Sequence, residues 1–388
     1  MKFITADNVK ELMSKQSAPA ISLFMPTHRT SSPPHMQEDH TRYKNLIREI
    51  ESQMKEQDID HAFQKEATAF FEGLLDDQEF WRHQHEGLAM FFSKDVQEFF
   101  NLSVTVDEFC AVSDQFYVLP LLTQAEENQE YTVLALSVHE PKIYHGSMYS
   151  LEESTIELPT DPETAFQIDE MHINKIQPRG VRVRQPNTGT APGIFHGHGG
   201  APREVEDDQR KRFFKLLDSI IASKTDTSLP LVIIGVESYV VEYKQVSSHQ
   251  KIVEQHIDGN AKNTDIAALH QSTWDVVYEH VVMKRHDESL NTFGELIASN
   301  RSTTDPKQVE EAAEQGRVDT LFTATLAHTT DTVADSLKAA PKIIFPDGND
   351  AFKLNKNALN VFEQGGRVLA MTADTMPDQA ATAATLRY

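Results

Sequence analysis

Apolar positions in the first third of the chain alternate between helical and strand-like spacing. An unbroken apolar run predicts a buried strand over residues 20–25, which Pro26 ends because it has no N–H to donate. Helices are predicted over 39–57 and 60–75, where apolar side chains recur every three or four positions. Further strands are predicted over residues 87–92, 98–104 and 115–122. Residues 1–128 are therefore expected to form an α+β domain.

A polar, acidic run at residues 124–129 is expected to connect this domain to the next one. Beyond it, two strand-like runs around the turn at Glu140 and Pro141 predict a hairpin, and a helix is predicted over 206–224. The apolar run at 229–236 is typical of a strand covered on both faces. These elements predict an α/β middle domain over residues 129–285.

Helix and strand signals alternate in the last hundred residues. Asp305 and Pro306 can start a helix that Gly316 ends, and a strand is predicted over 317–323. The same order returns in a helix over 355–364 and a strand over 367–371. Residues 286–388 are therefore expected to form an α/β/α sandwich.

The charge of the chain is strongly acidic but unevenly distributed. It has 36 Lys and Arg against 59 Asp and Glu, a net charge of −23. Residues 175–224 nevertheless hold 10 basic and 5 acidic side chains, a net charge of +5. Cys110 is the single cysteine, which excludes an internal disulfide, and no apolar run is long enough to span a bilayer. We expect a cytoplasmic protein that needs no cofactor.

The first part of this basic window, at about residues 175–205, is a long segment in which apolar side chains show little periodicity. Loops of this length are rare in compact domains unless they have a function or are disordered. Glycines let a backbone approach another molecule closely, histidines can bond to or stack on bases, and Arg and Lys bind phosphates. The residues expected to contact RNA are Arg179, Arg182, Arg184, His196, Gly197, His198, Gly199, Gly200, Arg203, Arg210 and Lys211.

Two other interpretations of the segment stay open. It can be a disordered glycine-rich linker in which the histidines are incidental. His196 and His198 can also be metal ligands, but two ligands do not hold a transition ion, and no third one stands at helical spacing nearby. We therefore expect no metal site.

Short motifs in a fixed order resemble the archaeo-eukaryotic peptide chain release factor and Pelota superfamily. PTHR at 26–29, GIFHGHGG at 193–200 and GRVDTLF at 316–322 are similar to its bacterial members, the group related to the hibernation factor Balon. The resemblance spans essentially the whole chain. It implies three domains with an RNase H-like middle domain.

The resemblance also implies a function. Superfamily members are tRNA-shaped proteins that enter the ribosomal A site, usually with a translational GTPase, for which elongation factor Tu is a candidate here. In release factors the middle-domain loop ends in Gly-Gly-Gln, whose glutamine helps to place the water that hydrolyses peptidyl-tRNA. Here Gly199 and Gly200 are followed by Ala201, which cannot orient water. His28 and Arg29 fall in the domain that faces the decoding site.

The sequence thus predicts a ribosome-binding factor of hibernation, rescue or quality control that does not hydrolyse peptidyl-tRNA. One alternative is a hydrolase of peptidyl-tRNA or RNA in which His196 and His198 act as acid and base. Another is an interaction scaffold that has kept the fold without binding ribosomes.

Overall fold

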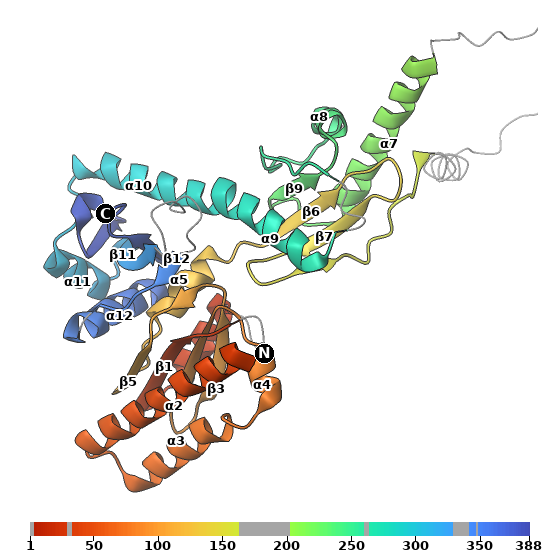
Figure 1. Ribbon diagram of the computed structural model, residues 1–388. Helices are drawn as coiled ribbons and strands as arrows, with labels where there is room; N and C mark the ends of the chain where they lie inside the picture. The colour runs from red at the N-terminus through yellow and green to blue at the C-terminus, as the bar shows by residue number, and fades with distance from the viewer. Residues whose placement is uncertain (1–3, 29–32, 163–201, 260–263, 329–340, 347) are drawn as a thin grey trace, which may run out of the picture. The chain divides into compact units, whose positions relative to one another are not determined.

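The computed structural model describes residues 4–28, 33–162, 202–259, 264–328, 341–346 and 348–388. Contacts divide the chain into two compact units (Figure 1). Unit 1 combines Met1–Asn128 with Arg285–Tyr388, and unit 2 is Gln129–Lys284. The first and last segments of the chain therefore fold together, while the division into three domains stays a prediction.

Sheet A of unit 1 is antiparallel. Its strand order is β3 (Gln97–Leu102), β2 (Gly87–Phe92), β1 (Ala20–Pro26) and β5 (Phe109–Ser113). Beside it lie α1 (Ala6–Lys15), α2 (Pro33–Glu56), α3 (His61–Gly73) and α4 (Gln78–Arg82). The apolar stripes of α2 and α3 pack with one face of the sheet around Tyr43, Phe71 and Phe92, so both predicted helices are confirmed.

The prediction of a strand over 115–122 is wrong. The chain forms α5 (Leu119–Glu127) there, and Pro120 stands in its first turn. Residues 124–127 of the run expected to connect the domains belong to this helix, where Gln124 and Glu127 are buried. A helix that is buried on most sides has no polar face, so its sequence lacks the helical period.

Sheet B of unit 1 has the order β10 (Ser302–Thr303), β14 (Thr382–Leu386), β11 (Val318–His328), β12 (Pro341–Ile343) and β4 (Thr105–Val106). β13 (Arg367–Thr372) pairs with β11 in parallel. β4 comes from the first segment of the chain and joins β12, so this sheet links both ends of the sequence.

Helices cover sheet B as the sandwich prediction requires. α11 (Pro306–Glu314) and α12 (Gly348–Glu363) contact β11, and Phe293 of α10 (Met283–Ile297) packs on Phe322 and Leu369. Asp305 caps α11 by accepting from the backbone N–H of Lys307 at 3.0 Å, as its sequence predicts. The helix predicted over 355–364 begins earlier, at Gly348.

Unit 2 is built on sheet C, ordered β8 (Leu151–Glu153), β7 (Lys142–Gly146), β6 (Tyr131–Ala135) and β9 (Leu231–Ile234). β6 and β7 form the predicted hairpin, and β9 runs parallel to β6. α7 (Pro202–Lys224) and α8 (Glu237–Val246) belong to one apolar cluster, whereas α9 (Ile266–Val277) belongs to another. Because successive side chains of β9 point to opposite faces, Ile233 enters the first cluster and Val232 the second. The expected mixed α/β fold is confirmed, and β9 is the predicted doubly covered strand.

Candidate nucleic-acid interface

Helix α7 carries the basic residues that follow the glycine- and histidine-rich segment. Phe213, Phe214 and Leu217 are buried and fix the helix on sheet C. The opposite side of the same turns is exposed and carries Lys211 and Lys215. The apolar period of α7 therefore determines which of its cations reach solvent.

Arg210 already has partners within the protein. Its Nε and Nη2 donate to Glu242 Oε2 and Oε1 of α8 at 2.7 and 2.6 Å, and Nη2 also lies 2.6 Å from Asp207 Oδ1. The guanidinium stands over the ring of Tyr239, 5.3 Å from its centroid. Hydrogen bonds to Glu242 raise the pKa of Arg210, although burial opposes them. This cation joins α7 to α8, and its charge is neutralised where it stands.

Lys211 and Lys215 differ from Arg210 in this respect. They are exposed one helical turn apart, and neither forms an ion pair with any residue that the structure describes. Arg212 is 3.0 Å from Asp208, but both side chains are more than half exposed, so this pair is weak and can exchange its partner. We call Lys211, Lys215 and the neighbouring Arg212 the cationic face of α7.

Most residues predicted to contact RNA lie outside the described part of the chain. These are Arg179, Arg182, Arg184, His196, Gly197, His198, Gly199 and Gly200, together with the decoding-side residue Arg29. Arg203 falls in the first turn of α7, where side chains are not described. Their contacts with RNA stay predictions.

His28 is the described member of the decoding-side pair. Its Nδ1 lies 2.9 Å from Asp39 Oδ1, and its backbone N–H donates to Asp39 Oδ2 at 3.1 Å. The ring stacks on His35 with centroids 4.2 Å apart and planes 11° from parallel. Arg42 also approaches Asp39, at 3.5 Å. The sequence indicated only a mixed-charge helix here, whereas the buried Asp39 in fact orients the His28 ring.

A polar network that the sequence did not indicate supports the end of α8. Asp218 of α7 is buried and accepts hydrogen bonds from Tyr243 Oη at 3.1 Å, from Ser247 Oγ at 2.5 Å, and from the Oγ and N–H of Ser248 at 2.7 and 2.8 Å. Burial alone would raise the pKa of Asp218, but these hydrogen bonds outweigh it, so the pKa is lowered. The network connects α7 to the chain that leaves α8.

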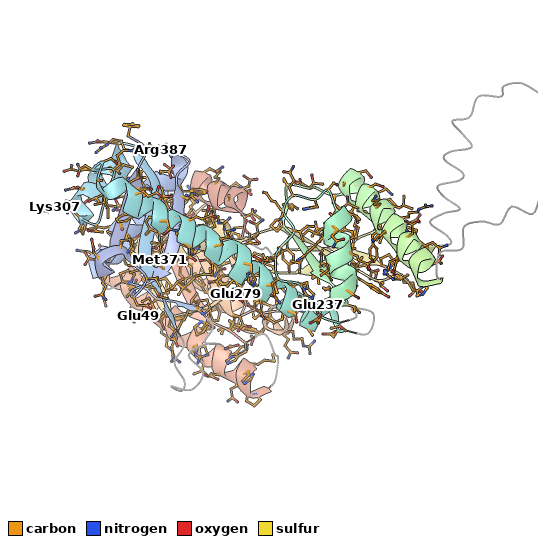
Figure 2. The ribbon with its side chains drawn as sticks, turned by 90° about the horizontal axis from the view of Figure 1, so that it is seen from above. Glu49, Glu237, Glu279, Lys307, Met371 and Arg387 are labelled. Carbon is orange, nitrogen blue, oxygen red and sulfur yellow. The ribbon has the colours of Figure 1, made fainter. Side chains whose placement is uncertain are left out.

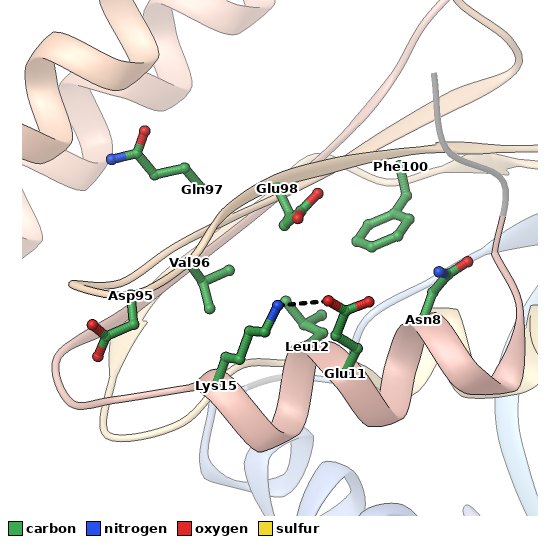
Figure 3. A pocket seen from close by; sticks show the side chains of 9 residues that line it. All are labelled: Asn8, Glu11, Leu12, Lys15, Asp95, Val96, Gln97, Glu98 and Phe100. Atoms are coloured by element: carbon green, nitrogen blue, oxygen red, sulfur yellow. Dashed lines mark hydrogen bonds and ion pairs between the residues drawn. The ribbon is translucent and has the colours of Figure 1, made fainter.

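Pockets also lie outside α7 in the described part of the chain, including open hollows of about 370 Å³ between α2 and α3 and about 510 Å³ beside Phe109 and Phe345. A pocket of about 50 Å³ between α1 and β3 has room for a few water molecules, and Lys15 in its wall is paired with Glu11 (Figure 3). Nowhere in the described ranges do three or more His, Cys, Asp or Glu side chains gather as metal ligands. Of the described helices, none is both long and apolar enough to cross a membrane.

Comparison with known proteins then shows which family the middle of the chain resembles. The family described as "Bacterial archaeo-eukaryotic release factor family 3" matches residues 130–317, a range that includes sheet C, α7 and the basic window. These residues therefore resemble the bacterial archaeo-eukaryotic release factor-like family. No curated protein matches it.

Solved structures similar to this chain include three archaeal proteins. The crystal structure of Archaeoglobus fulgidus Pelota is 12% identical, covering 100% of this chain and 94% of that one, with a TM-score of 0.37. Thermoplasma acidophilum Pelota is 10% identical, covering 100% and 95%, with a TM-score of 0.26. An archaeal translation termination factor is 13% identical, covering 100% and 99%, with a TM-score of 0.22.

Proposed function

We propose that this release factor-like chain is a translation factor that binds the ribosome in the A site as a tRNA mimic. The observation that carries the proposal is the coincidence of the family match with the basic window. The match spans residues 130–317, and within this range Lys211 and Lys215 present cations that have no partner among the described residues.

The charge distribution supports a restricted RNA contact. With a net charge of −23, most of the surface repels a phosphate backbone, whereas a cationic face next to the glycine-rich segment attracts it. If about five or six phosphates are neutralised, log K against log salt has a slope near −4 with the single-strand coefficient. Acidic surface elsewhere suits basic ribosomal proteins or a translational GTPase such as elongation factor Tu.

The proposed factor does not hydrolyse peptidyl-tRNA. Ala201 follows Gly199 and Gly200 at the place where the release factors that this chain resembles have glutamine. A methyl side chain can neither donate to nor accept from a water molecule. We assign the factor to hibernation, rescue or quality control, in which the ribosome is occupied or recycled without release by this protein.

A release assay tests this proposal together with its rival. The full chain is added to ribosomes that carry labelled peptidyl-tRNA in the P site and an empty A site. We expect binding that aminoacyl-tRNA in the A site prevents, and no release above background. Release that is lost in His196→Ala or His198→Ala would establish the hydrolase instead, and binding that ignores A-site tRNA would contradict the proposed location.

A further inference from the structure

Three arginines meet at one end of sheet B in unit 1. Arg301 precedes β10, Arg317 precedes β11 and Arg387 follows β14, the strand between those two. Backbone hydrogen bonds hold the three positions side by side: Arg387 N–H donates to the carbonyl of Arg317, and Leu386 N–H to that of Arg301, both at 2.8 Å. We call these residues the arginine cluster; Figure 2 labels Arg387.

Neutral oxygens rather than carboxylates hold the guanidinium groups. Arg301 Nη2 donates to the carbonyl of Arg387 at 2.7 Å, and Arg387 Nη2 to that of Gln364 at 2.8 Å. Arg317 Nε donates to Gln315 Oε1 at 2.9 Å. Each guanidinium has five N–H donors, so several of them remain for a ligand. These contacts restrain the side chains without cancelling their charge.

Nearby carboxylates do not neutralise the cluster. Glu314 is paired with Lys356 at 2.7 Å, and Asp319 accepts from Thr320 Oγ1 at 3.1 Å. Within the part of the chain that the structure describes, no arginine of the cluster has an ion pair within 4.0 Å. Three arginines without an ion pair thus lie at this end of sheet B in a chain of net charge −23.

We propose that the arginine cluster is a second RNA-binding surface, in unit 1, that contacts the phosphates of a single strand. Guanidinium groups bind phosphate oxygens with two parallel N–H donors, and release of counterions supplies affinity without a preformed pocket. Tyr388, next to Arg387, is 73% exposed and offers a ring on which a base can stack. Restrained cations beside an exposed aromatic ring fit RNA better than an acidic protein, whose affinity needs buried anchors.

Fluorescence anisotropy of the full chain with a labelled 12-nucleotide oligouridylate tests the surface. The measurement uses the Lys211→Glu/Lys215→Glu background, so that α7 contributes little. In this background we expect Arg317→Glu to weaken binding about tenfold and to lower the salt slope by about 0.7, the share of one phosphate contact. Arg317→Lys, which keeps the charge, is expected to bind within about twofold of the parent.

Lys307→Glu is the matched control for this charge reversal. Lys307 is exposed in unit 1 at the start of α11 and has no ion pair among the described residues (Figure 2). It stands at the far end of that helix from Arg317, with about 10 Å of helix axis between Lys307 and Glu314. We expect it to change RNA affinity less than twofold.

Three results would overturn the proposal. Equal affinities of Arg317→Glu and Lys307→Glu would show a non-specific charge effect. Loss of all binding in the α7 background alone would leave no role for the cluster. Binding of a polyglutamate peptide that depends on Arg317, with RNA binding that does not, would assign the surface to an acidic protein. These results do not test the A-site proposal, which is measured separately on ribosomes.

Discussion

Arg210 and Glu242 form a two-bond ion pair between α7 and α8, with N···O distances of 2.7 and 2.6 Å. Lys211, the next residue, is exposed and has no ion pair among the described residues. Two adjacent cations that the sequence placed in one RNA-binding set thus differ in their surroundings. Arg210 stabilises the helix pair, whereas Lys211 is available to a ligand.

Alanine substitutions should separate these roles. We expect Arg210→Ala to lower the free energy of unfolding by about 1–3 kcal/mol, because Glu242 loses its charged partner while it is only 21% exposed. Lys211→Ala should change it by less than about 0.5 kcal/mol, as exposed positions do. Urea unfolding followed by circular dichroism measures both. Equal losses for the two variants would contradict the distinction.

Asn355 is predicted to be essential for the packing of α12 on the start of α5. It is fully buried, its Oδ1 accepts from the N–H groups of Val118 and Leu119 at 2.7 and 3.0 Å, and its Nδ2 donates to the carbonyl of Phe116 at 2.9 Å. Asn355→Ala leaves these backbone groups without a partner, so we expect a loss of about 2–4 kcal/mol.

Thermal and urea unfolding measure that loss. Asn360→Ala, a change of the same chemistry at a less buried position of the same helix, is the control and should cost less than about 1 kcal/mol. If both variants are equally stable, the hydrogen bonds of Asn355 do not matter for the fold.

Glu127 should make stability depend on pH. Burial raises the pKa of its carboxyl to about 7 from 4.5; Arg285 opposes the rise and Glu126 adds to it. Between these values the folded state binds the proton more tightly than the unfolded state, so stability falls as pH rises from 4.5 to 7. Glu127→Gln removes this dependence. Relative to the native chain it should gain up to about 3 kcal/mol between pH 4.5 and pH 8.

Comparing the native chain with Glu127→Gln removes the contribution of His286 to the pH dependence of stability. Burial lowers the pKa of His286 to about 4, so its effect runs the other way: stability is lost as pH falls from 6.5 to 4. This loss is common to both proteins and cancels in their difference. A difference in unfolding free energy that is the same at pH 5 and pH 8 would contradict the assignment to Glu127.

Patterns of neighbouring residues predicted many of the helices and strands. Contacts between residues far apart in the sequence could not be predicted in this way. The cap of α11 by Asp305 and the strand β13 follow from residues within a few positions. The helix α5 was not predicted, because it is buried on most sides and its sequence therefore has no polar face. The partner of Arg210 stands 32 residues away, and the amide of Asn355 bonds to backbone more than 230 residues away. No spacing in the sequence encodes either contact.

The candidate interface stays a prediction, and the structure describes only its α7 part. Residue type and local charge placed Lys211 in a basic window of the sequence, and its exposure follows from the apolar period of α7. The same reasoning cannot tell an arginine that is paired within the fold from one that is available. Asp218 was likewise not singled out, because its donors Ser247 and Ser248 lie about 30 residues further along the chain.

Cosedimentation with vacant 70S ribosomes tests the central claim most directly. The full chain, Lys211→Glu/Lys215→Glu and Lys307→Glu are pelleted with ribosomes at low and moderate salt. The account predicts that the native chain and Lys307→Glu bind with strong salt dependence, whereas the α7 double variant, folded by circular dichroism, loses at least about tenfold in affinity. Equal binding of all three proteins, or no binding of the native chain at low salt, would contradict it.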